Sequence, residues 1–169
     1  MPRNRRRLPL AEFFHQYRDE GFFYDRTQSA PDEFERLCEF LEFPDDLDER
    51  RELYEYREAR REYNAALTNQ FNHIYGTRVD RYDAWHDLCS RVGVIDIPDT
   101  IRGCKAIIRE THVNLVDLTE AISNDSTVET FDTEYELREY TIETRKIFPR
   151  ANIHSGDLLR FLLRKIFSL

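Results

Sequence analysis

The sequence has few of the residues that mark turns, since only 5 glycines and 6 prolines occur among 169 residues. Hydrophobic residues make up 40% of the chain, and 12 Phe and 9 Tyr supply much of its bulk. This combination favours long helices joined by short connections. Because no Gly/Ser-rich linker divides the chain, we expect a disordered basic arm over residues 1–8. One mainly α domain, a multi-helix bundle, should follow over residues 9–169.

Long apolar runs are also missing. No uncharged apolar stretch approaches the roughly 18 residues of a membrane span, and the start of the chain lacks the apolar part of a secretory signal. The acidic residues that begin at Glu12 come too early for a mitochondrial presequence. The three cysteines are an odd number without CxxC spacing, which argues against a disulfide framework and favours a reducing compartment. We therefore expect an intracellular protein, cytoplasmic or nuclear, with no membrane partner.

The formal net charge of −8 is unevenly distributed. Four arginines near the start contribute +4, and removing them from the total leaves −12 on the rest of the chain. They are Arg3, Arg5, Arg6 and Arg7. An acidic body repels phosphate backbones, which argues against general nucleic-acid binding by the folded domain. The arm itself is a candidate contact for nucleic acid or for an acidic partner, or a nuclear address.

Apolar residues recur at helical spacing along most of the chain. Capping residues then predict where helices begin and end. The predicted starts are Ser29, Asp80, the run of Pro98, Asp99 and Thr100, then Asp132 or Thr133, and Ser155. The predicted stops are Gly21, Gly76 and Gly93. Residues expected to face inward are Leu10, Phe13, Phe14, Tyr17, Phe34, Leu37, Cys38, Leu41, Tyr82, Trp85, Leu88, Cys89, Val92, Ile101, Cys104, Ile107, Ile108, Leu158, Leu159, Leu162, Leu163 and Ile166.

The most informative segment is a predicted helix over residues 46–75, capped by Asp45 or Asp46. In its first part, residues 48–62, 11 of 15 residues are charged, whereas residues 63–75 carry apolar side chains at helical spacing. We call residues 48–62 the charged segment. The pattern predicts a solvated helix that runs into a packed core.

The charged segment needs support. Its ion pairs, such as Asp48 with Arg51, stabilise a helix by only a few tenths of a kcal/mol each, so they do not prevent fraying. It must therefore lean on its own domain or on another chain. Leu53, Tyr54 and Tyr56 are the apolar anchors that it offers to a partner.

The region after Thr111 allows two interpretations. Leu115, Leu118 and Ile122 have the spacing of a helix, whereas Val113, Leu115 and residues 128–131 suit a short two-stranded hairpin across the polar loop at residues 123–126. We favour the hairpin.

Four stretches carry a resemblance to a known family. They are FNHIYGTRVDRYDAWHDLC at 71–89, THVNLVDL at 111–118, REYTIETRKIFPR at 138–150 and GDLLRFLLRKI at 156–166. In their order and spacing, the chain resembles a family of small proteins predicted in filamentous fungi, for which no activity is established. The resemblance covers most of residues 22–167, although the charged segment is longer here. It implies a single intracellular domain and supplies no catalytic residues.

Specific motifs for metal or nucleotide binding are absent. The best local metal-ligand pair is His86 with Cys89, and Cys104 and His112 complete a site only if the fold brings them together. We instead expect Cys89 to pack in the core and His86 to face solvent. The acids near Asp46 lack the spacing of a calcium loop, and both glycine-rich phosphate-binding patterns are missing.

Nucleophilic catalysis also lacks a signature. The neighbours His154 and Ser155 have no third group to orient them, so Ser155 is better explained as a helix cap. Cys38 and Cys104 are expected to be buried and inert.

Polar side chains are concentrated at the end of the predicted long helix. Asn69, Gln70, Asn72 and His73 either contact a partner or tie neighbouring loops. We expect structural amides that tie the turn at Gly76.

These observations favour a non-enzymatic protein-interaction module that uses no cofactor or metal. Its expected contact surfaces are the charged segment and the basic arm. The alternative is a nucleic-acid-associated protein whose arginine arm neutralises phosphates. An enzyme with an active site assembled from distant residues stays open, and a cleft that places His73, His112 or His154 beside carboxylates would support it. The sequence identifies neither the partner nor the oligomeric state.

Overall fold

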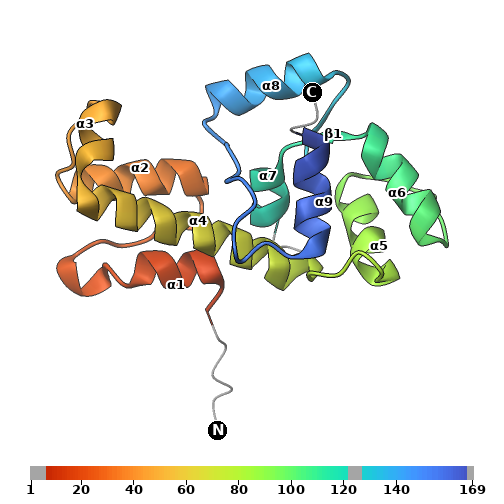
Figure 1. Cartoon of the computed structure of the whole chain (residues 1–169), viewed down its shortest axis with the longest axis horizontal. Helices are drawn as coiled ribbons and strands as arrows, with labels where there is room; N and C mark the ends of the chain where they lie inside the picture. The colour runs from red at the N-terminus through yellow and green to blue at the C-terminus, as the bar shows by residue number, and fades with distance from the viewer. Residues whose placement is uncertain (1–6, 122–126, 167–169) are drawn as a thin grey trace, which may run out of the picture. The chain divides into compact units, whose positions relative to one another are not determined.

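A computed structural model describes residues 7–121 and 127–166, without the side chains of residues 164–166. The described chain is mainly helical, and its only strands form one small antiparallel sheet (Figure 1). This confirms the predicted fold class. No helix within the described ranges is long and apolar enough to cross a bilayer.

The chain divides into two compact units, which we call the N-terminal unit (residues 1–70) and the C-terminal unit (residues 71–169). Helix α4 (Tyr54–Tyr75) contributes to both. Each unit has its own core. The expectation of a single domain over residues 9–169 stays a prediction.

The N-terminal unit has an aromatic core. Its elements are α1 (Pro9–His15), the 3₁₀ helix η1 (Arg18–Glu20), α2 (Ala30–Phe40), α3 (Leu47–Glu52) and most of α4. The ring of Phe34 on α2 stacks on Tyr63 of α4 with centroids 4.4 Å apart, and Phe13 of α1 lies 5.9 Å from the same Tyr63. Phe14 and Leu37 are fully buried. The predicted inward residues within α1 and α2 are buried, whereas Tyr17 and Leu41, just beyond the two helices, are half-buried.

Local capping chemistry explains the boundaries in this unit. Ser29 precedes α2 and accepts a hydrogen bond from the amide of Asp32, which satisfies one of the free amides of the first turn. Gly21 ends η1 with φ of 111°, a conformation that glycine adopts without steric cost. The start at Ser29 agrees with the sequence prediction, whereas the first helix ends at His15 and Gly21 ends the separate 3₁₀ helix η1.

The predicted helix over residues 46–75 is not continuous. Leu53 adopts an extended conformation, with φ −78° and ψ 129°, so α3 ends there and α4 begins at the next residue. Arg50 explains the break, because its buried side chain pairs with Glu35 of α2 at 2.8 Å and donates to the carbonyl of Pro44. Tethered in this way, α3 points away from the axis of α4 (Figure 1).

The C-terminal unit packs helices around Trp85, Leu118, Leu158 and Leu159, all of which are buried. Trp85 also meets the ring of Phe161 edge-on at 5.3 Å. The elements after α4 are α5 (Tyr82–Arg91), α6 (Ile101–Glu110), β1 (His112–Val113), α7 (Leu115–Glu120), β2 (Thr130–Phe131), α8 (Glu134–Glu143) and α9 (Asp157–Ile166).

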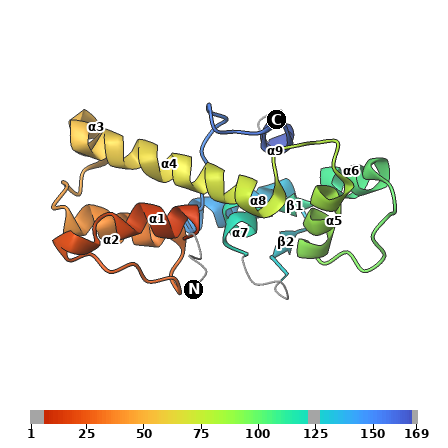
Figure 2. The ribbon, with the colours of Figure 1, turned by 90° about the horizontal axis from the view of Figure 1, so that it is seen from below.

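Both interpretations of the region after Thr111 are partly correct. Strand β1 pairs antiparallel with β2, with His112 opposite Phe131 (Figure 2). Helix α7 occupies the chain between them, because the side chain of Asn114 accepts hydrogen bonds from the amides of Val116 and Asp117 and so caps the helix. Ile122 and the predicted polar loop lie outside the described residues.

The predicted caps of the C-terminal unit divide into two groups. Thr100 and Thr133 cap α6 and α8 as predicted, and Thr133 forms a full capping box with Glu136. The predictions for Asp80 and Ser155 are wrong. Asp80 forms an ion pair with Arg78 and leaves α5 without a side-chain cap, and Ser155 lies before the start of α9 and accepts a hydrogen bond from Asn152.

Candidate functional site

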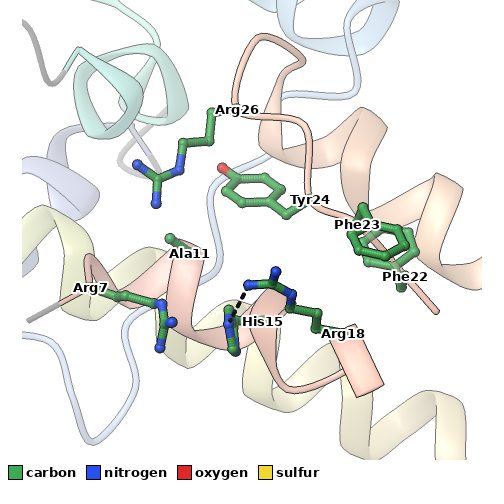
Figure 3. Close-up of a pocket in the computed structure, with 8 residues that line it drawn as sticks. All are labelled: Arg7, Ala11, His15, Arg18, Phe22, Phe23, Tyr24 and Arg26. Atoms are coloured by element: carbon green, nitrogen blue, oxygen red, sulfur yellow. Dashed lines mark hydrogen bonds between the residues drawn. The ribbon is translucent and has the colours of Figure 1, made fainter. Parts of the chain in front are cut away.

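The N-terminal unit carries a basic pocket of about 160 Å³ (Figure 3). Residues of α1 and η1 form one side, and the segment that follows Gly21 forms the other. The lining residues are Arg7, Ala11, His15, Arg18, Phe22, Phe23, Tyr24 and Arg26. We call this site the basic pocket.

Helical spacing and one turn build the pocket. Arg7, Ala11 and His15 are four residues apart, so they lie along one face of α1 and of the residues leading into it. At Gly21 the chain reverses, and the amide of Phe22 bonds back to the carbonyl of Tyr17 at 3.1 Å. The chain after Gly21 then faces α1 across the pocket.

The arginines of the pocket have no carboxylate partner within the described residues. Among the described residues, the side chains of Arg7 and Arg26 form no ion pair or hydrogen bond, and that of Arg18 contacts only the Nε2 of His15, at 3.5 Å. Several arginines elsewhere in the described chain do pair with acids. Examples are Arg36 with Glu33, Arg50 with Glu35, Arg61 with Glu58, Arg78 with Asp80 and Arg81 with Asp83. The pocket therefore concentrates uncompensated positive charge on an acidic protein.

The aromatic residues of the pocket differ in their freedom. Phe22 is buried, with the guanidinium of Arg36 4.2 Å from its centroid. Tyr24 stacks on Phe14, with centroids 4.5 Å apart. Phe23, by contrast, is 66% exposed, so its ring is available to a ligand at the edge of the pocket.

The C-terminal unit carries a different hollow, an apolar groove of about 370 Å³. It is bounded by β1, α8, the chain after α8 and α9. Its apolar lining residues are Val113, Leu115, Leu137, Ile142, Ile147, Phe148 and Leu163. Polar lining residues are Thr111, His112, Asn114, Glu134, Arg138, Thr141 and Lys146. We call this site the apolar groove.

Helix α8 leaves much of its apolar surface uncovered beside the groove. None of its residues is fully buried. Ile142 is 58% exposed, and Ile147, just after the helix, is 59% exposed. Such apolar residues gathered at a hollow are typical of a contact surface, whereas single exposed ones are ordinary.

A polar cluster holds α8 beside α7. The Nζ of Lys146 lies 2.6 Å from the Oδ1 of Asp117 and 2.7 Å from the hydroxyl of Tyr140, which itself donates to Asp117 at 2.8 Å. Burial by itself lowers the pKa of Lys146, but the hydrogen bonds to Asp117 and Tyr140 outweigh it and the pKa is raised. Burial raises the pKa of Tyr140. The cluster keeps Lys146 charged and serves to position α8.

The three predicted anchors of the charged segment have different environments. Tyr56 is only 7% exposed and packs between Phe34 and Phe43, so its assignment as a partner-binding residue is not compatible with the packed unit. Leu53 is half-buried at the break between α3 and α4. Tyr54 is 63% exposed and remains available. The charged segment thus packs mainly against other elements of the N-terminal unit.

The basic arm is described only at its end. Arg3, Arg5 and Arg6 lie outside the described residues, whereas Arg7 is exposed and lines the basic pocket.

Two of the predicted amides are structural. The Oε1 of Gln70 accepts a hydrogen bond from the amide of Leu10, and Asn72 donates to the carbonyl of His154 at 2.7 Å. They therefore tie α1 and the chain before α9, not the turn at Gly76. Asn69 and His73 are exposed.

The candidates for metal binding and catalysis do not converge. Cys89 is buried and His86 is exposed, as predicted, and no group of three or more potential ligands occurs in the described ranges. Cys38 and Cys104 are buried as well, and burial raises the pKa of Cys38 to about 12. His112 and Glu134 both line the apolar groove, yet no hydrogen bond or ion pair joins them among the described residues.

Sequence reasoning missed both hollows. Each is built by segments that meet through tertiary packing, such as β1 with the chain after α8. A partial signal was present in Arg18 and Arg26, which flank the aromatic run 22–24, whereas Arg7 lies fifteen positions before that run. Tertiary placement alone brings them together.

No protein-family model, curated protein or solved structure matches this chain. The resemblance to a family predicted in filamentous fungi stays a prediction.

Proposed function

We propose that this protein is a non-enzymatic protein-interaction module whose main contact surface is the apolar groove. The groove holds an amphipathic helix of a partner, with the apolar face of that helix toward Ile142 and Ile147. Exposed Tyr54 of the charged segment serves as a further anchor. The observation that carries the proposal is an open apolar groove beside a helix without a fully buried residue.

Shape and composition of the groove support this partner class. Helix-binding grooves are apolar hollows that receive side chains at helical spacing. At about 370 Å³ the groove has room for a few apolar side chains. Leu137 and Phe148 supply fixed walls, while the exposed Ile142 and Ile147 gain most from being covered.

The negative charge of α8 indicates which residues the partner helix should carry. Four glutamates of this helix accompany a single arginine, and all five are exposed: Glu134, Glu136, Arg138, Glu139 and Glu143. An acidic rim attracts basic residues and repels acidic ones. The favoured partner is therefore an amphipathic helix with lysines or arginines beside its apolar face.

A synthetic peptide tests the proposal directly. The probe is a fluorescein-labelled amphipathic peptide of about 18 leucine and lysine residues, or five helical turns, and the reference is a scrambled peptide of the same composition. We expect fluorescence anisotropy to show tighter binding of the amphipathic peptide. The double variant Ile142→Ser/Ile147→Ser should lose this preference.

Ile95→Ser is the matched control, because Ile95 is 94% exposed in the same unit but does not line the groove. It should bind as the wild type does. Equal binding by the groove variant and the wild type would refute the groove as the contact surface. Affinity purification with the three proteins then identifies natural partners as those lost only with the groove variant.

Nucleic-acid association is the second candidate function. The observation that favours it is that Arg7, at the end of the arm, borders further unpaired arginines in the basic pocket. The arm would neutralise phosphates, so retention of RNA or DNA should weaken steeply with salt. Deletion of residues 1–6 should reduce this retention while leaving peptide binding in the groove unchanged. Absence of any retention at low salt would exclude this function.

An intracellular location, cytoplasmic or nuclear, also belongs to the proposal. It is supported by three free, buried cysteines, which suit a reducing compartment.

A further inference from the structure

The basic pocket contains positive charges that no carboxylate of the described residues neutralises. Arg7, Arg18 and Arg26 have no carboxylate partner within the described residues, and Figure 3 shows Arg18 and Arg26 reaching into the space between α1 and the facing chain. A guanidinium presents several N–H donors in a rigid plane that matches the oxygens of a phosphate. Three such groups suit an anion with several oxygens.

The amount of charge favours a phosphate monoester over a carboxylate. A phosphate monoester carries about −1.5 to −2 charges at pH 7 and has three acceptor oxygens, whereas a carboxylate carries one charge and two oxygens. The pocket volume of about 160 Å³ lies below the roughly 300 Å³ at which pockets enclose a whole drug-sized ligand. A phosphate therefore enters while the rest of its molecule stays outside.

The edge of the pocket indicates what that molecule is. Phe23 exposes 66% of its surface on the same chain segment as Tyr24 and Arg26. Aromatic side chains beside arginines stack on the flat faces of nucleobases in proteins that bind single strands. Every nucleotide carries such a flat base beside its phosphate, whereas a phosphopeptide presents an aromatic ring only where its sequence supplies one.

We propose that the basic pocket binds the terminal phosphate of a nucleotide, with Arg7, Arg18 and Arg26 around the phosphate and Phe23 against the base. The nucleotide is either free or the phosphorylated end of a single strand, since both present the same groups. The inference deepens the second candidate function and is independent of the apolar groove. It assigns recognition of the strand end to the pocket and non-specific retention to the arm.

Binding of four ligands to the full-length protein distinguishes recognition of the phosphate from recognition of the base and of the strand. They are adenosine monophosphate, adenosine, and a short single-stranded oligonucleotide with either a 5′-phosphate or a 5′-hydroxyl. We expect adenosine monophosphate to bind in calorimetry and adenosine not to bind. The 5′-phosphate should improve oligonucleotide binding by about tenfold, the effect of one strong charge-assisted hydrogen bond.

Substitutions locate the effect in the pocket. Arg18→Gln/Arg26→Gln should abolish the preference for the 5′-phosphate and should fold normally, because both side chains are exposed. Arg57→Gln removes an exposed arginine of the same unit outside the pocket and should keep the preference. Phe23→Ala should lower the affinity of the protein for adenosine monophosphate without changing its affinity for inorganic phosphate.

The outcomes distinguish the pocket from the arm. Deletion of residues 1–6 should lower the affinity for both oligonucleotides by the same factor, so the preference for the 5′-phosphate should remain. If the full-length protein binds adenosine monophosphate but does not retain the 5′-hydroxyl strand at all, the proposed role of the arm is refuted. The proposed phosphate site in the pocket is then still supported. No binding of adenosine monophosphate, an unchanged preference in Arg18→Gln/Arg26→Gln, or tighter binding of a phosphoserine peptide than of adenosine monophosphate overturns the proposal.

Discussion

Gly156 lies directly against Thr77. A Cβ atom on Gly156 would be 2.5 Å from the Cβ of Thr77 and 2.7 Å from its Cα. The carbonyl of Thr77 also accepts a hydrogen bond from the amide of Leu158 at 3.0 Å, so the chain after α4 satisfies a first-turn amide of α9. This contact takes the place of the side-chain cap that the sequence predicts at Ser155.

Gly156→Ala should therefore destabilise the protein by about 2–3 kcal/mol, because the added methyl meets backbone that no rotamer change can move. Chemical denaturation followed by circular dichroism measures the change. Gly76→Ala is the control, since Gly76 has φ of 80° and open space around it, and it should cost about 1 kcal/mol through the backbone alone. A Gly156→Ala cost no larger than that of Gly76→Ala would contradict the close contact.

Lys146→Met should lower stability at pH 7 by about 2 kcal/mol, because it leaves Asp117 half-buried without its cation. Tyr140→Phe should cost about 1 kcal/mol. A double-mutant cycle with Asp117→Asn checks the coupling: the loss from Lys146→Met should be much smaller when the carboxylate is already absent. Full additivity would show that the pair contributes nothing.

The same cluster predicts a loss of stability at alkaline pH. The pKa of Lys146 is raised above its ordinary 10.5 and that of Tyr140 above 10.0, so the unfolded chain releases these protons first. Their stabilising effect is complete below about pH 10 and is lost as the pH rises through the folded values. The unfolding free energy of wild type should fall more steeply above pH 10 than that of Lys146→Met. Parallel curves would contradict this linkage.

The elements that the sequence predicts correctly depend on local chemistry. Ser29, Thr100 and Thr133 each accept a hydrogen bond from an amide three residues away, so these caps depend only on the local sequence. Gly21 and Gly76 end elements because of their own backbone conformations.

The errors have a different origin. The break at Leu53 depends on the pairing of Arg50 with Glu35, fifteen positions earlier, and nothing in the local pattern marks Arg50 as different from its neighbours. The start of α9 depends on Thr77. The basic pocket and the apolar groove likewise form where segments distant in the sequence meet. The sequence contains their lining residues but does not show that these residues lie together.

Cysteine reactivity provides a further prediction. Burial raises the pKa of both Cys38 and Cys89 to about 12, against an ordinary value of 9.0. At pH 8 this lowers the thiolate fraction by about a thousandfold, and burial also blocks access. Iodoacetamide should therefore label neither residue in the native protein and both in denaturant, as mass spectrometry of the digested protein would show. Rapid native labelling of either one would contradict its burial.

Two neighbouring arginines provide the sharpest test of the N-terminal unit. Arg50 is 5% exposed and binds both Glu35 and the carbonyl of Pro44, whereas Arg51 is exposed and pairs only with Asp48 at 3.1 Å. Arg50→Ala should cost about 2 kcal/mol, because it removes buried packing and leaves Glu35 and the carbonyl without their donor. Arg51→Ala should stay within about 0.5 kcal/mol of wild type, since an exposed ion pair contributes little. Denaturation curves of the two variants make the comparison. Equal effects would mean that α3 is not held by Arg50, and that the charged segment is the solvated helix that its composition suggests.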